Sequence, residues 1–97
     1  MEPLIERMKV VLATAHSLYL KAQYYHWNVT GPDFAQYHDF LGKVYTQVFE
    51  SLDDYGEKIR ILGAYAPGSL SRFGELTRIQ DEDTIPAAHA MLYRLGE

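Results

Sequence analysis

Four side chains in this sequence have the types and spacing of metal ligands. His26 and His38 are twelve residues apart, and Asp53 and Glu57 are separated by one helical turn. Two carboxylates four residues apart on a helix project from the same face, where they can bind one cation or a pair of metal ions. The whole set suits Fe(II), Mn(II) or Zn(II), and its carboxylates favour the harder Fe(III) after oxidation.

Each half of this set also has a simpler interpretation. Exposed carboxylates such as Asp53 and Glu57 are most often only solvated. An isolated histidine on an apolar helix face is more often a hydrogen-bonded core residue than a ligand, so it is the combination that favours a metal site. Asp54 is excluded because it falls on the solvent row of the same helix. His16 and His89 lack a carboxylate partner at helical spacing, and neither is expected to bind metal.

Two long helices are expected to position these side chains. Apolar residues recur at alternating spacings of four and three from Leu4 to Tyr25, which predicts one amphipathic helix. The segment 28–33 (NVTGPD) should end this helix, because it contains a glycine and a proline. Asp33 is expected to be the N-cap of a second helix, with Gln36 completing a capping box.

The second helix carries three of the four candidate ligands. The same spacing of apolar residues runs from Phe34 to Leu62 and stops at Gly63, which predicts an antiparallel pair of helices joined by a tight turn. Gly42 and Gly56 lie inside this helix, where each glycine costs about 1 kcal/mol relative to alanine. Close packing against a neighbour would explain such a glycine; otherwise it is only a weak point.

Two further amphipathic segments follow. The apolar residues from Leu70 to Ile79 predict a short helix after a loop that contains proline and glycine. A third long helix is expected to begin between Thr84 and Pro86, since proline is favoured at the first helical position. Its buried stripe would consist of Ala88, Met91, Leu92 and Leu95.

Composition narrows the chemistry and the partners. A lone bundle of 97 residues would bury too little apolar surface to be comfortably stable, so a partner is expected. The absence of cysteine leaves histidine and carboxylate as the strong ligand types. A net charge of −4 has the wrong sign for binding nucleic acid. Neither a membrane-spanning apolar run nor a signal peptide is recognisable, which predicts a cytoplasmic protein without membrane contact.

The distance between the two halves of the set predicts a site shared by two chains. His26 ends the first helix and His38 opens the second, so the hairpin brings the histidines together. Asp53 is fifteen residues beyond His38, which is roughly 22 Å along a continuous helix and too far for one metal ion. The same fifteen residues leave both side chains within ~60° of one helical face. A two-fold partner laid antiparallel on that face would place Asp53 and Glu57 of one chain opposite the histidines of the other.

The segments that carry these ligands resemble a known family. HWNVTGPDFAQYH (26–38) and LDDYGEKIRILG (52–63) are similar to the paired signature of the Dps family, the miniature ferritins that protect DNA in starved bacterial cells. The resemblance covers about Leu18 to Ile79. It implies an all-α, ferritin-like four-helix bundle, assembled as a hollow shell of twelve subunits. Residues 1–97 would form one partial domain with the antiparallel first two helices, a short connecting helix and the start of the third bundle helix.

The resemblance also implies an activity. Members of the family bind Fe(II) between two-fold-related subunits, oxidise it preferably with hydrogen peroxide and store Fe(III), which protects against oxidative damage. The family's ferroxidase ligands match, by position, His26, His38, Asp53 and Glu57. Trp27 matches the aromatic residue next to the site, to which a role in accepting an electron or radical is ascribed.

Three features depart from the family pattern. Members usually carry an acidic residue four positions after the second histidine, where this chain has Gly42, so a second and weaker iron position is affected. The lysine-rich tail of several DNA-binding members does not precede the first helix. The sequence stops early in the third bundle helix, which suggests a fragment or a half-bundle that dimerises. The alternative function is therefore a non-catalytic assembly or DNA-associated module with a degenerate metal site.

Overall fold

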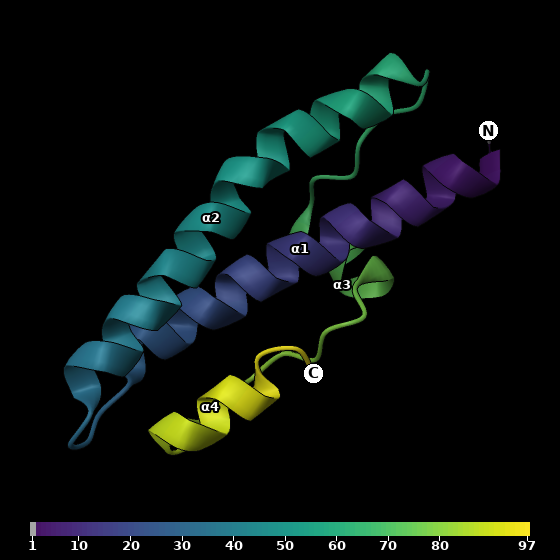
Figure 1. Cartoon of the computed structure of the whole chain (residues 1–97). Helices are drawn as coiled ribbons and strands as arrows, with labels where there is room; N and C mark the ends of the chain where they lie inside the picture. The colour runs from purple at the N-terminus through teal and green to yellow at the C-terminus, as the bar shows by residue number, and fades with distance from the viewer. Residues whose placement is uncertain (1) are drawn as a thin grey trace.

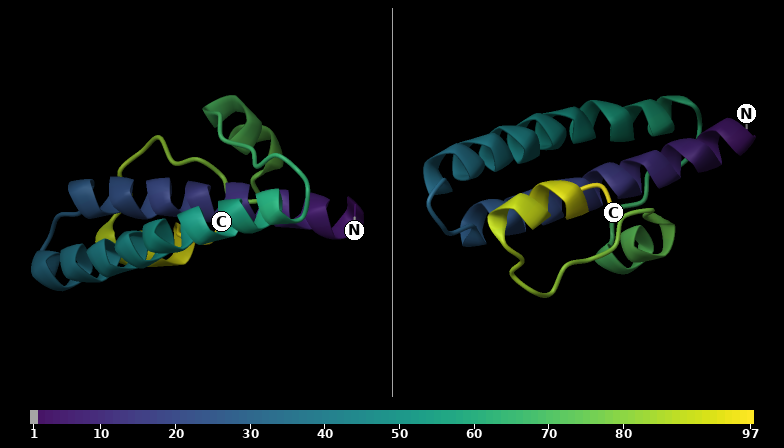
Figure 2. Two further views of the ribbon diagram at one scale, coloured as in Figure 1. Left: turned by 90° about the horizontal axis from the view of Figure 1, so that it is seen from above. Right: turned by 60° about the horizontal axis from the view of Figure 1, so that its bottom comes forward.

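The computed structural model describes residues 2–97, and this part of the chain is all-α, with four helices and no strand (Figure 1). The helices are α1 (Glu2–Asn28), α2 (Phe34–Ile61), α3 (Leu70–Leu76) and α4 (Ala88–Arg94). Helices α1 and α2 form a long antiparallel hairpin, as predicted. Helix α3 packs near the middle of α1, and α4 lies beside the C-terminal part of α1 (Figure 2).

A tight turn joins α1 to α2. Gly31 has a φ of +113°, a conformation that other residues rarely adopt, and its carbonyl oxygen accepts a hydrogen bond from the Phe34 N–H at 3.1 Å. The predicted break at 28–33 is therefore confirmed, but the predicted capping box is wrong. Asp33 has a ψ of 30°, not the extended value of most N-caps, and its side chain accepts no hydrogen bond from the helix. Without that bond from the Asp33 side chain, Asp33 and Gln36 do not form the pair of reciprocal hydrogen bonds that defines a capping box.

Helix α2 is continuous to Ile61, within one residue of its predicted end. Gly63 closes it with a φ of +96°, and the Gly63 N–H donates to the carbonyl oxygen of Arg60 at 3.0 Å. Helical structure continues through Gly42 and Gly56, so the two ends of α2 are held at a fixed separation.

Helix α3 is shorter than the predicted segment. Ser69 caps it, because the Ser69 hydroxyl accepts a hydrogen bond from the Arg72 N–H at 3.2 Å. The chain then turns extended at Thr77, whose ψ is 148°, and Ile79 lies outside the helix.

Helix α4 begins at Ala88, so the predicted start between Thr84 and Pro86 is wrong. The polar groups of Thr84 form hydrogen bonds outside a helix. The Thr84 hydroxyl donates to the Glu82 carboxylate at 2.8 Å, and the carbonyl oxygen of Thr84 accepts a hydrogen bond from the Tyr24 hydroxyl at 2.9 Å. These bonds hold the connection against α1 in a non-helical conformation.

Most of the buried apolar residues form two separate clusters at opposite ends of the hairpin. The carboxylate-end cluster joins α1, α2 and α3, and it consists of Leu12, Ala13, Ile59 and Phe73. The histidine-end cluster joins the turn region to α4, and it consists of Tyr25, Val29, Leu41 and Met91.

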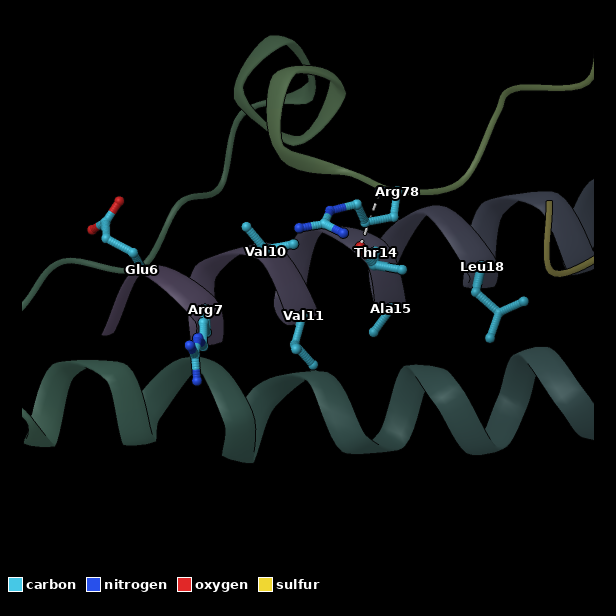
Figure 3. A pocket seen from close by; sticks show the side chains of 8 residues that line it. All are labelled: Glu6, Arg7, Val10, Val11, Thr14, Ala15, Leu18 and Arg78. Carbon is cyan, nitrogen blue, oxygen red and sulfur yellow. Dashed lines mark hydrogen bonds between the residues drawn. The ribbon is translucent and has the colours of Figure 1, made fainter. Parts of the chain in front are cut away.

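The molecule is elongated, with extents of 49 × 22 × 18 Å, and one side of α1 is open. A groove of about 690 Å³ follows Val10, Val11, Ala15 and Leu18. Figure 3 shows it crossed at one point by Arg78, whose backbone N–H donates to the Thr14 hydroxyl at 3.1 Å. Among residues 2–97, no helix is both long enough and apolar enough to cross a membrane.

Candidate metal centre

His26 and His38 form a close pair at the turn end of the hairpin. Their ring centroids are 3.7 Å apart with an interplanar angle of 19°. His26 Nδ1 lies 2.6 Å from the carbonyl oxygen of His38, and His38 Nδ1 lies 2.9 Å from the carbonyl oxygen of His26. A carbonyl oxygen can only accept, so each Nδ1 carries the proton and donates. In the neutral ring this tautomer leaves Nε2 with its lone pair, which is the form of imidazole that binds a metal ion.

Aromatic rings enclose the histidine pair on both sides. Phe34 stacks on His38 with centroids 4.9 Å apart, and Tyr45 packs its ring against His26 at 5.2 Å in an edge-on arrangement. Both histidines, Gly42 and Tyr45 line one surface depression of about 590 Å³. The depression gives a small ion access to the pair.

Gly42 is in direct contact with His26. A Cβ added at residue 42 would lie 3.0 Å from His26 Cε1 and 3.2 Å from His26 Nδ1. The glycine therefore lets the imidazole lie directly on the backbone of α2, which explains this interior glycine by close packing. No such contact exists at Gly56, where an added Cβ has no neighbour within 4 Å.

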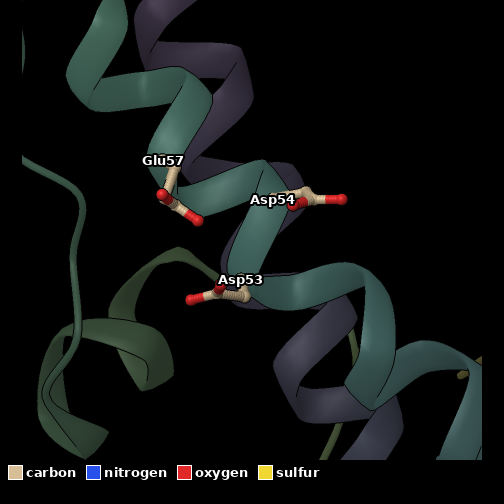
Figure 4. Close-up of side chains that lie close together, drawn as sticks. All are labelled: Asp53, Asp54 and Glu57. Atoms are coloured by element: carbon tan, nitrogen blue, oxygen red, sulfur yellow. The ribbon is translucent and has the colours of Figure 1, made fainter.

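The two candidate carboxylates lie on the exposed surface of α2. Asp53, Asp54 and Glu57 each offer a carboxylate oxygen, and these oxygens all lie within 4.8 Å of one another. Figure 4 shows Asp53 and Glu57 on one side of α2, with Asp54 turned away from them. The pKa of Glu57 is raised, first by its hydrogen bond with Asp53 and then by the negative charge of Asp53. Such repulsion between neighbouring carboxylates is relieved by a bound cation.

Within one chain the two halves of the proposed set remain apart. The carboxylates border a second depression of about 740 Å³ that is shared with Phe49, His16 and Phe73, and it contains neither His26 nor His38. Because α2 is unbroken between His38 and Asp53, the predicted separation of roughly 22 Å holds. The single chain thus keeps the two candidate halves of the site apart: the histidine pair of α1 and α2 lies at the turn, and the carboxylates lie farther along α2. The exclusion of Asp54 stays a prediction.

Trp27 lies apart from the histidine depression. Its side chain is 66 % exposed and lines a different depression, together with Lys21, Tyr24 and the acidic segment 81–83. The role of Trp27 as the aromatic residue of the site stays a prediction.

Sequence reasoning missed Tyr45 beside the histidine pair, and it named His16 only as a residue not expected to bind metal, without its contacts. Tyr45 is seven residues after His38, and this helical spacing could have placed it on the same face. His16 stacks on Phe73 with centroids 4.7 Å apart, and its buried Nδ1 has no hydrogen-bond partner. Burial also lowers the pKa of His16, so the ring is held neutral. No sequence signal indicated these contacts of His16, because they depend on α3.

Known proteins are similar to this chain along most of its length. The model of the ferritin-like domain matches residues 5–95. The DNA protection during starvation protein of Helicobacter pylori is 35% identical over 77 residues, which are 79% of this chain and 54% of that protein. Antigen TpF1 of Treponema pallidum superposes with a TM-score of 0.91 at 30% identity, over 97% of this chain and 61% of the other.

A Dps protein of Vibrio cholerae, described as a member of a broad superfamily of ferritin-like diiron-carboxylate proteins, superposes with a TM-score of 0.89 at 25% identity. The superposed region covers 97% of this chain and 59% of that protein. The chain spans about half the length of the curated relatives it matches. From its fold and these similarities, the chain belongs to the ferritin-like family and, within it, to the Dps proteins.

Proposed function

We propose that this chain binds Fe(II) at a site between two copies, oxidises it with hydrogen peroxide and takes part in the storage of Fe(III). The observation that carries the proposal is the pair of reciprocal hydrogen bonds between His26 and His38, which leaves two free Nε2 atoms. Asp53 and Glu57 lie on the same continuous helix, where a two-fold partner can present them to those nitrogens.

The donor set fits an iron ion that changes its oxidation state. Neutral imidazole nitrogens bind Fe(II) well, and the carboxylates of Asp53 and Glu57 favour Fe(III) as the harder product. The neighbouring Asp53 raises the pKa of Glu57. Because a ligating carboxylate must lose its proton, the affinity for a metal ion should increase as the pH rises. One peroxide accepts an electron from each of two Fe(II) ions and yields two Fe(III) and two hydroxide ions.

The minimal unit of the proposal is a two-fold dimer. The exposed carboxylates and the histidine pair become one site only when a second copy covers both. Relatives described as Dps proteins share this fold, and a twelve-subunit shell is the assembly that we propose for the whole protein.

Anaerobic titration with Fe(II), followed by peroxide, tests the proposal. We expect rapid oxidation at about one peroxide per two Fe(II), the ratio that the two-electron reduction of peroxide requires. His38→Ala or Asp53→Ala should abolish most of the activity, whereas Asp54→Ala should retain nearly all of it. No Fe(II) binding above background would instead support a non-catalytic assembly module. Equal losses for Asp53→Ala and Asp54→Ala would contradict the choice of ligands.

A further inference from the structure

Lys21 is a buried amine that the proposed iron site does not use. Among residues 2–97 it is the only buried residue with a charged side chain, and 6% of its surface is exposed. It lies on α1 and borders neither the depression of the histidine pair nor that of the carboxylates. None of the ion pairs in the described part of the chain includes it. This burial therefore calls for another explanation.

Lys21 borders the depression that also contains Trp27. This depression, of about 280 Å³, lies between α1 and the segment 80–83. Leu20, Tyr24 and Trp27 supply apolar surface to it, and Lys21 supplies an amine. Pockets for drug-sized ligands measure roughly 300–1,000 Å³, so this one suits a smaller molecule with a short apolar part.

The surroundings of Lys21 favour a reactive amine. Burial lowers the pKa of Lys21, because removal from water disfavours the charged form. The negative charges of Glu82, Glu97 and Asp81 act in the opposite direction, but burial is the larger effect. The positive charge of Arg94 adds to the lowering. More of this amine is therefore neutral, and so nucleophilic, than of an ordinary exposed lysine.

The acidic neighbours limit which electrophile fits this amine. Acylation would convert it into a neutral amide, and carbon dioxide would convert it into an anionic carbamate. Either product would leave the carboxylates of Asp81 and Glu82 without a positive charge beside them. Condensation with an aldehyde keeps that charge, because the imine nitrogen can hold a proton. The same carboxylates then stabilise the protonated imine.

We propose that Lys21 is a carbonyl-binding site, at which the amine condenses with a small apolar aldehyde to form a protonated imine. The amine nitrogen attacks the carbonyl carbon, and a C–N bond forms. The carbonyl oxygen leaves as water and takes one proton from the amine and one from the solvent. Nothing is oxidised or reduced in this step, so the site is independent of the proposed iron oxidation.

Reductive trapping tests the assignment. The full chain is incubated at neutral pH with a limiting amount of propanal and with sodium cyanoborohydride, which reduces the imine to a stable secondary amine. Peptide mass spectrometry then locates the modified lysines. Lys43 and Lys58 are the matched controls, because both are exposed on α2. We expect Lys21 to be modified severalfold faster than either control, and equal or slower modification of Lys21 would overturn the proposal.

Trp27 provides a second measurement, because it is the only tryptophan in the sequence and borders the same depression. Titration with propanal should change its fluorescence in a saturable way. Lys21→Arg keeps the positive charge but cannot form an imine, so the saturable change should be lost in this variant.

A saturable change of the same size in Lys21→Arg would contradict the site. Circular dichroism checks that the variant has the parental helix content, and the trapping experiment on the parent protein decides the matter if it does not. Neither measurement contains iron, so a failure of the proposed iron oxidation would leave both results unchanged.

Discussion

Nδ1 of His26 lies 2.6 Å from the carbonyl oxygen of His38, and the reverse pair of atoms lies 2.9 Å apart. Each histidine therefore fixes the tautomer and the orientation of the other through a backbone carbonyl. These two bonds also join the last turn of α1 to the first turn of α2. A ligand pair supported in this way needs little rearrangement when it binds an ion.

Gly42→Ala should separate stability from metal binding. The new Cβ would lie 3.0 Å from His26 Cε1 and must push the ring away from α2. We expect Co(II) affinity to fall by about tenfold, the order found when the support of a ligand is disturbed. The free energy of unfolding should gain less than the roughly 1 kcal/mol that alanine brings to an unobstructed helix position, because the displaced ring weakens the bonds between α1 and α2. Isothermal titration and chemical denaturation measure the two effects.

Gly56→Ala provides the stability control on the same helix. Its added Cβ would have no neighbour within 4 Å, so only the gain in helix propensity is expected. Unchanged Co(II) affinity in Gly42→Ala would show that the close contact with His26 does not set the position of the ring.

Two inactive variants should complement each other. The first, His26→Ala/His38→Ala, keeps the carboxylates, and the second, Asp53→Ala/Glu57→Ala, keeps the histidines. A heterodimer contains one intact site and one empty site, so random exchange should restore about a quarter of the parental peroxide consumption. Each variant incubated alone is the control. No recovery in a mixture that mass spectrometry shows to have exchanged would rule out a shared site.

Acid should weaken the connection between α3 and α4 through Glu82. Hydrogen bonds from Thr84 and then Tyr25 lower the pKa of Glu82 to about 2, from its ordinary value of 4.5. Because the folded-state pKa is lowered, this stabilisation is present above pH 4.5 and is lost as the pH falls towards about 2. Glu82→Gln should lower the unfolding midpoint at neutral pH and flatten its dependence on pH in that range.

Glu75→Gln is the matched control for Glu82→Gln. Glu75 pairs with Arg72 on the surface at 3.1 Å, and its side chain is 66% exposed, whereas that of Glu82 is 13% exposed. Exposed pairs of this kind contribute little. Thermal unfolding followed by circular dichroism should therefore show a much smaller effect, and equal effects would contradict the role of Glu82.

Binding of DNA by this chain should be negligible at physiological salt. The net charge of −4 repels a phosphate backbone, and few cations would be released on binding. A gel-shift assay against duplex DNA measures this directly. A retarded band at that ionic strength would show a local basic patch that outweighs the net charge.

The hairpin could be predicted because its signals are local. Apolar spacing defined both long helices, and the glycine and proline of the segment 28–33 defined the turn between them. The start of α4 could not be predicted in the same way. Pro86 favours a helix start, but the bonds of Thr84 with Glu82 and Tyr24 come from residues up to sixty positions away and outweigh that preference.

The candidate site was predictable in residue types but not in detail. Twelve residues around a tight turn were enough to bring His26 and His38 together, and the unbroken helix confirms that Asp53 lies far from them within one chain. The exchange of hydrogen bonds between the histidines depends on the exact packing of α1 on α2. The contact of Gly42 with His26 depends on it as well: the interior glycine indicated close packing, but the sequence did not identify His26 as the neighbour.

The two core clusters share no buried residue, so local opening at one end of the hairpin is expected to leave the buried contacts of the other end in place. In a site shared between two copies, the ion would join the histidine end of one subunit to the carboxylate end of its partner. Binding would then require the histidine end of one subunit and the carboxylate end of its partner to be folded at the same time. Bound iron would therefore couple local unfolding in one subunit to local unfolding in the other. As metal is added, amide hydrogens at both ends should become protected from exchange together.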